Sequence, residues 1–177
     1  TSLLHQEGNK RRKCVSPNYF NFIFNMNDKD MNKPFSQVRF FKPEDVGPRI
    51  WGREILVAHV PGLYTGKVLM RRAEDAHKKR SMQFHRIKNE SAYLYSGEMW
   101  FYYDAGDGKI SQKKLMAGDC VHIPPGAVHS EQAITDCVLF ETSNPVFNDR
   151  VRINDQYGLP NPEGGLPSTR FDEIEIR

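Results

Sequence analysis

Two short blocks of side chains that can bind a metal ion constrain the fold of this chain more than any other feature. The first block, Gln83–Glu90, contains a glutamine, a histidine and a glutamate, and the second ends at His129 after a Pro-Pro-Gly turn. Residues i and i+2 of an extended strand point to the same side, so Gln83 and His85 share one face. Glu90 begins the next strand after a short connection. Side chains from two strand–turn–strand units meet only where strands close over one another, which favours an all-β fold.

Short segments rich in β-branched and aromatic residues recur along most of the chain. Gly, Pro and acidic residues separate them about every 8–12 residues, as in antiparallel sandwiches and barrels. No helical period extends beyond about two turns. The expected strands are Val38–Phe41, Arg53–Val60, Gly66–Arg72, Ser81–Ile87, Ala92–Tyr95, Glu98–Tyr103, Lys109–Met116, Cys120–Ile123, Val128–Ala133 and Cys137–Thr142. We therefore predict an all-β protein with one antiparallel barrel.

The length of 177 residues favours a single domain. We expect residues 1–35 to form an N-terminal arm with a possible edge strand at Tyr19–Phe24, and residues 36–145 to form the barrel. Residues 146–177 are rich in Pro and Gly, so we expect an irregular C-terminal tail packed on the barrel.

Charge and composition limit the partners that we expect. The net charge of +3 lies entirely within residues 1–13, and the rest of the chain is neutral, so no nucleic acid partner is expected. No apolar run approaches the roughly 20 residues needed to span a membrane, and no apolar stretch resembles a signal peptide. The three cysteines fit neither a zinc site nor a disulfide framework. We therefore expect a cytoplasmic protein.

The chemistry of the two blocks points to one divalent transition metal. We predict that its ligands are Gln83, His85, Glu90 and His129. A mixed nitrogen and oxygen ligand set suits Zn, Fe, Mn, Co or Ni without choosing among them. Water or substrate would fill the remaining positions, as in a working site. An amide oxygen is the poorest of these ligands, so Gln83 could instead bond a neighbouring strand or a water molecule.

Two further residues are candidates for acid–base catalysis. His122 faces the barrel interior if Val121 and Ile123 face outward; the alternative is a structural histidine with a hydrogen-bond partner. Glu131 alternates with His129 and so points the same way. It could orient that ligand or take a proton, or it could lie in water at the barrel rim.

These blocks resemble the paired motifs of the cupin superfamily, G-x5-H-x-H-x(3,4)-E-x6-G and G-x5-P-x-G-x2-H. The positions that match, in order and spacing, are His85, Glu90, Gly97, Gly118, Pro124, Gly126 and His129. His77 replaces the leading glycine, and Gln83 replaces the first histidine. The resemblance covers residues 50–143 and implies a jelly-roll barrel with a metal inside it. It also implies a homodimer, because cupins commonly dimerise.

A narrower similarity involves the isomerase domain of bifunctional mannose-phosphate isomerase/guanylyltransferases. That domain has Q-x-H-x(4)-E, then Y-I-P-x-G-x-x-H, and then R-x-x-D-x-Y-G-R. This chain has the first motif, a close relative of the second, and Arg152–Gly158 in the third, but Leu159 replaces the final arginine. The similarity implies a small-molecule substrate such as a sugar or sugar phosphate.

Three functions follow from these observations. The first is a metal-dependent enzyme of the sugar-isomerase type, in which Glu131 or His122 moves a proton. The second is a mononuclear non-heme iron dioxygenase that uses His85, Glu90 and His129. The third is a non-catalytic, metal-stabilised cupin that binds or senses a ligand.

Overall fold

The structure is a computed structural model, and it describes residues 38, 40–75, 81–160 and 168–177. The chain divides into two compact units, residues 1–41 and residues 42–177. The predicted arm over residues 1–35 and His77 lie outside the described residues. The described residues of the predicted strand Val38–Phe41 belong to no strand, so that prediction is wrong in this part.

Unit 42–177 is built from strands, and its described residues contain no α-helix. The strands are β1 (Glu44–Arg49), β2 (Gly52–Val60), β3 (Tyr64–Arg71), β4 (Gln83–His85), β5 (Glu90–Ser96), β6 (Glu98–Asp104), β7 (Ile110–Met116), β8 (Cys120–Ile123), β9 (His129–Ala133), β10 (Cys137–Ser143) and β11 (Arg150–Arg152). The all-β prediction is confirmed. Most of the predicted strands begin and end within two residues of the ends of an observed strand.

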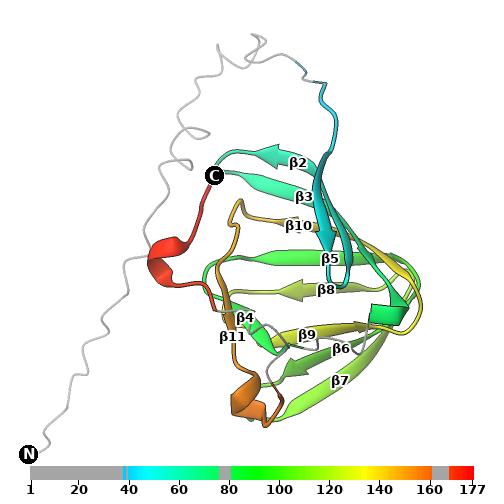
Figure 1. Ribbon diagram of the computed structural model, residues 1–177, viewed down its shortest axis with the longest axis vertical. Coiled ribbons are helices and arrows are strands. Elements are labelled where there is room, and N and C mark those ends of the chain that lie inside the picture. Colours follow the sequence, from blue (N-terminus) through cyan, green and yellow to red (C-terminus); the bar gives the residue numbers. More distant parts are fainter. Residues whose placement is uncertain (1–37, 39, 76–80, 161–167) are drawn as a thin grey trace, which may run out of the picture. The chain divides into compact units, whose positions relative to one another are not determined.

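The strands form two antiparallel sheets that face one another (Figure 1). The six-stranded sheet has the order β1-β2-β3-β10-β5-β8, and the five-stranded sheet has the order β11-β4-β9-β6-β7. Neighbours that are distant in sequence, such as β3 and β10, pair along their whole length. This arrangement is the jelly-roll barrel that the two motifs implied.

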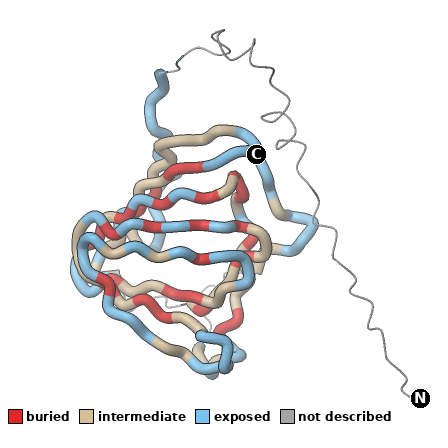
Figure 2. The backbone as a smooth tube through the Cα atoms, turned by 180° about the vertical axis from the view of Figure 1, so that it is seen from behind, coloured by how far each residue is buried: buried red, intermediate tan, exposed pale blue. Residues whose placement is uncertain are grey.

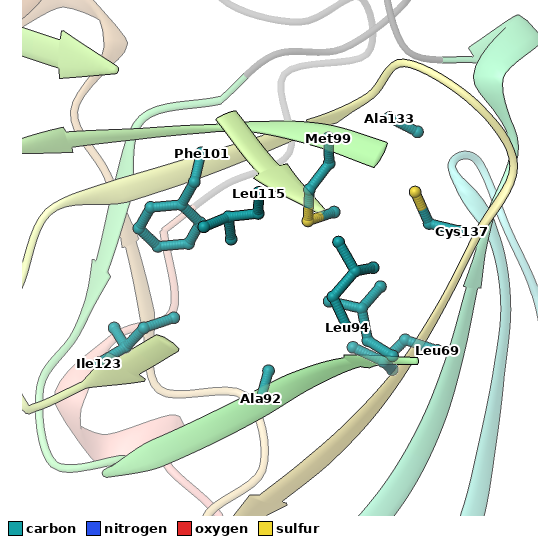
Figure 3. Close-up of a cluster of buried hydrophobic side chains, with 10 residues drawn as sticks. Leu69, Ala92, Leu94, Met99, Phe101, Leu115, Ile123, Ala133 and Cys137 are labelled. Carbon is teal, nitrogen blue, oxygen red and sulfur yellow. The ribbon is translucent and has the colours of Figure 1, made fainter. Parts of the chain in front are cut away.

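Alternation along the strands decides which side chains enter the barrel. Buried and exposed positions alternate along β5 and β10, as Figure 2 shows for the strands of the six-stranded sheet. The inward side chains of both sheets meet in one apolar core, with Leu94, Met99 and Leu139 almost completely buried. Figure 3 shows Leu94 and Met99 pointing toward one another from opposite sheets. The core fills one part of the interior and leaves the rest to polar residues.

The C-terminal segment is more regular than we predicted. It contains β11 and two 3-10 helices, Asn154–Tyr157 and Phe171–Glu173. Strand β11 forms because it pairs with the free edge of β4, while Val151 packs into a second apolar cluster around Met82 on the outer face of the five-stranded sheet. The prediction of an irregular tail is therefore wrong at β11, and this strand bears on the site described next.

Gly97, one of the residues that match the cupin motifs, holds the turn between β5 and β6. Its φ of +91° lies in the left-handed region, and a Cβ there would come 2.3 Å from the carbonyl oxygen of Asp136. We expect Gly97→Ala to lower the free energy of unfolding by about 3 kcal/mol or more, because strain and overlap add. Gly106→Ala is the matched control, since its φ is +104° but nothing lies within 4 Å of its Cβ. Urea unfolding measures the stability of both variants. Equal losses of unfolding free energy in Gly97→Ala and Gly106→Ala would contradict this account.

Candidate metal centre

Three of the four predicted ligands meet inside the barrel. His85 ends β4, Glu90 begins β5 and His129 begins β9, so the two facing sheets both contribute (Figure 1). All three side chains are buried. Oε1 of Glu90 lies 3.6 Å from Nε2 of His85 and 3.8 Å from Nε2 of His129. The ligand atoms of the three residues all lie within 4.8 Å of one another.

This geometry fits a transition metal ion. Three atoms with these separations can each lie about 2.4 Å or less from a common point, close to the roughly 2.0–2.2 Å of Zn–N and Zn–O bonds. The donor set of two imidazoles and one carboxylate is one that zinc, iron, manganese and related ions accept. Small inward movements of the side chains would complete the bonds. His85, Glu90 and His129 would therefore hold the ion.

Asp149 fixes His85 in the form that can bind a metal. Nδ1 of His85 lies 2.6 Å from Oδ1 of Asp149, a fully buried carboxylate. A carboxylate only accepts hydrogen bonds, so Nδ1 carries the proton and Nε2 presents its lone pair to the centre. Burial would raise the pKa of Asp149, but hydrogen bonds from His85 and from the backbone N–H groups of Ile87 and Lys88 lower it to about 2.

His129 is held in the same tautomer by the backbone. Its Nδ1 donates to the carbonyl oxygen of Ala127, 3.0 Å away, at the end of the Pro-Pro-Gly turn. Nε2 therefore bears a lone pair directed at Glu90. Burial lowers the pKa of His129, which keeps the imidazole neutral at physiological pH. In its neutral form, each imidazole thus directs the lone pair of its Nε2 toward one point.

A buried lysine divides the roles of the two oxygens of Glu90. Nζ of Lys88 forms an ion pair with Oε2 of Glu90 and lies 2.6 Å from Oε1 of Glu141. This leaves Oε1 of Glu90 to face the histidines. Burial alone would lower the pKa of Lys88, but Glu141 and Glu90 raise it above its ordinary value. Despite its burial, Glu141 has a pKa of about 2 because Lys88 and Lys67 lie beside it.

Gln83 lies next to the centre, but its amide oxygen has another partner. Gln83 stands opposite His129 in the pairing of β4 with β9, and so it shares the inner face. Nη1 of Arg152 is 3.3 Å from Oε1 of Gln83 and also donates to Oγ of Ser81. Ligation by Gln83 stays a prediction, since the amide would have to leave Arg152.

His122 does not point into the barrel. We predicted an inward His122 on the condition that Val121 and Ile123 face outward, but both pack against the apolar core. His122 is exposed, and its Nδ1 lies 2.9 Å from Oγ of Ser91 on the outer face of the six-stranded sheet. The packing of Ile123 sets the phase of the strand, so the inward orientation was wrong.

Glu131 does point inward, as predicted from its alternation with His129. It forms an ion pair with Nη2 of Arg71, and both side chains are largely buried. The guanidinium of Arg71 also stacks on Trp51, 4.4 Å from the ring centre. Arg71 therefore holds the Glu131 carboxylate two residues along β9 from His129.

A cavity of about 270 Å³ reaches the centre from the side of β6, β7 and β8. His129 lies in its wall, together with Phe101, Leu115, Val121 and Ile123. Tyr103, Asp104 and Lys113 add polar groups. A small organic molecule can therefore contact the centre through His129.

The sequence pattern missed Asp149, Lys88 and Glu141. Lys88 and Glu90 are two residues apart, a spacing that could have suggested a shared direction. Glu141 alternates with buried Leu139 on β10, which marks it as an inward carboxylate. Asp149 carried no local signal, because its partner His85 is 64 residues away.

Curated proteins give a partial match. No protein-family model matches the chain. An oxalate decarboxylase of Arthroderma benhamiae is 39% identical over 57 residues, which are 32% of this chain and 13% of that protein. A second, probable oxalate decarboxylase from the same organism is also 39% identical over 57 residues. The matched region thus spans less than one sixth of these relatives.

Solved structures match over more of the chain. The capsular polysaccharide assembling protein CapF from Staphylococcus aureus aligns with 63% of this chain and 32% of its own, with a TM-score of 0.53 and 18% identity. The nucleoside dehydratase Pac13 of Streptomyces aligns with 67% of this chain and 92% of its own, with a TM-score of 0.50 and 14% identity. All of these proteins share one fold. The chain is therefore a protein of the cupin fold.

Proposed function

We propose that this protein is a metal-dependent enzyme of the sugar-isomerase type that acts on a small, oxygen-rich molecule. One observation carries the proposal: His85, Glu90 and His129 direct three ligand atoms at one buried point, and Asp149 and Ala127 fix both histidines in the metal-binding tautomer. Three protein ligands leave coordination positions for a substrate, as in catalytic rather than structural sites.

The residues around the centre support proton transfer at carbon. A divalent cation held there would supply Lewis acidity to a carbonyl or hydroxyl oxygen beside it. Glu131 is the inward carboxylate closest along β9 to a ligand, and we assign to it the role of taking and returning a proton at the neighbouring carbon. The ion pair with Arg71 holds the Glu131 carboxylate in place. Phe101 and Ile123 give the cavity apolar walls beside His129.

The comparisons support a small-molecule substrate. CapF is a capsular polysaccharide assembling protein and Pac13 is a nucleoside dehydratase, so both act in the chemistry of sugar-containing molecules. The resemblance of Gln83–Glu90 to mannose-phosphate isomerase domains points to the same class. We propose in the same way that the protein binds a divalent metal ion, forms a homodimer and takes a sugar or sugar phosphate as its substrate.

Proton exchange with solvent tests the proposal. The protein is loaded in turn with Zn, Mn, Co or Fe(II), mixed in D2O with a panel of aldoses, ketoses and their phosphates, and followed by proton NMR. We expect deuterium to enter beside the carbonyl of at least one substrate. Glu131→Gln should slow this exchange by about 100-fold or more, the usual contribution of a general base. Exchange that Glu131→Gln leaves unchanged would contradict the assigned role.

A dioxygenase is the second candidate, and Gln83 favours it. If its amide stays with Arg152, the remaining ligands are two histidines and one carboxylate, the set found in non-heme iron oxygenases. Oxygen uptake distinguishes the two. Substrate-dependent uptake by the iron-loaded protein, with no solvent exchange under any metal, would favour the dioxygenase.

A further inference from the structure

Strand β11 places two arginines on the inner face of the barrel, beside the metal centre. β11 lies along β4 (Figure 1), and the register sets Arg150 opposite His85 and Arg152 opposite Gln83. Residues directly opposite one another on paired strands share a face, so both guanidinium groups lie on the side of the predicted ligands. Adjacent strands are about 4.8 Å apart, which makes Arg150 an immediate neighbour of His85.

Arg150 and Arg152 differ from the other cations of the interior because neither forms an ion pair with a described residue. Four inward glutamates each have a cationic partner among the described residues. The pairs are Glu54 with Lys67 and Arg49, Glu90 and Glu141 with Lys88, and Glu131 with Arg71. Within the described part of the chain, Arg150 forms no ion pair, and its buried Nε has no hydrogen-bond partner.

A partly buried guanidinium with no counterion and a buried, unpartnered Nε is unfavourable unless a ligand completes it. Burial lowers the pKa of Arg150, although Glu90 acts on it in the opposite direction. Arg152 does not relieve this, since it repels Arg150, and its side-chain hydrogen bonds to described residues go to the neutral oxygens of Ser81 and Gln83. A cation at the metal centre would add further positive charge. The group that satisfies this arrangement is an anion with two or more oxygens, which matches the fork of a guanidinium.

We propose that Arg150 forms an oxyanion-binding subsite beside the metal centre, and that the substrate carries a carboxylate or phosphate group. This inference rests on the proposed function and narrows its substrate class. The metal centre lies between the cavity and Arg150, because His129 lines the cavity and His85 lies beside Arg150. A substrate that enters through the cavity would place its acidic group on the Arg150 side.

Calorimetric titration with two probes, glycolate and inorganic phosphate, tests the subsite. Each probe is titrated into zinc-loaded and metal-free protein, for the wild type, Arg150→Met and Arg150→Lys. We expect Arg150→Met to weaken binding of at least one probe by tenfold or more, with Arg150→Lys intermediate because it keeps the charge but loses the fork. If Arg150→Met loses affinity for glycolate alone, the substrate carries a carboxylate. If it loses affinity for phosphate alone, the substrate carries a phosphate group. Arg53→Met, which removes an exposed arginine, is the matched control.

Stability separates a binding role from a structural one. Removal of an uncompensated buried charge should leave the urea midpoint of metal-free Arg150→Met equal to or above that of the wild type. A lowered midpoint with unchanged affinity for both probes would overturn the subsite. So would equal affinities of wild type and Arg150→Met in both metal states. If the protein bound no zinc, the proposed function would fail, while Arg150-dependent binding to metal-free protein would still support the subsite.

Discussion

Lys88→Met should lower the free energy of unfolding of the metal-free protein by about 3–5 kcal/mol at pH 7, the range observed when one partner of a buried ion pair is removed. Lys88 contacts two buried carboxylates, Glu90 and Glu141. Methionine has a similar shape but no charge, so both carboxylates would lose their nearest cation while they remain buried. Urea unfolding with EDTA present measures the loss.

Lys114→Met is the control, because Lys114 pairs with Glu98 at 2.7 Å and both side chains are largely exposed. Such a surface pair contributes about 1 kcal/mol or less. The difference between wild type and Lys88→Met should also depend on pH. The pKa of Glu141, held at about 2 in the fold against an ordinary value of 4.5, stabilises the protein above pH 4.5 and ceases to do so as the pH falls toward 2. The difference should therefore narrow over that interval. Equal losses for Lys88→Met and Lys114→Met would show that Lys88 does not organise the buried carboxylates.

Asp149→Asn should weaken metal binding about 10- to 100-fold, the usual effect of losing the carboxylate behind a metal-binding histidine. Asp149 offers two acceptor oxygens to three donors: His85 and the backbone N–H groups of Ile87 and Lys88. Asparagine offers one. If its oxygen stays with the backbone, its NH2 group faces Nδ1 of His85, and the imidazole proton moves to Nε2, where the metal must bind.

Competition with a chromophoric chelator measures this affinity. Asp136→Asn is the control, because Asp136 is exposed and accepts one backbone hydrogen bond, from Ala73. Far-UV circular dichroism verifies that both variants are folded. An affinity of Asp149→Asn within twofold of the wild type would show that the tautomer of His85 does not depend on Asp149.

The sequence predicted the parts of the site that depend on local spacing. Alternation in Gln83–His85 and the turn before His129 were sufficient to predict that His85, Glu90 and His129 lie together, since their strands are short and their turns contain Pro and Gly. The same alternation failed for His122 because it fixes only relative directions. Which face of β8 is inward depends on the packing of Ile123, a contact made with other strands.

Long-range partners were beyond the reach of these patterns. Asp149 and Arg150 follow a segment rich in Asn and Pro that reads as irregular. They acquire their positions only when β11 pairs with the edge of β4. The Asp149 contact with His85 and the proposed oxyanion subsite therefore both depend on one three-residue strand that sequence periodicity could not reveal.

The number of metal ions per chain tests the central claim most directly. The wild type, His85→Ala, His129→Ala and His122→Ala are purified without chelators, incubated with a divalent metal, dialysed and measured by elemental analysis. We expect about one ion per chain in the wild type and in His122→Ala, whose side chain lies outside the barrel. His85→Ala and His129→Ala should each retain less than about a tenth of that amount, because a site with only two protein ligands does not hold its ion through dialysis. A wild type that holds no metal, or a His85→Ala variant that holds as much as the wild type, would contradict the account.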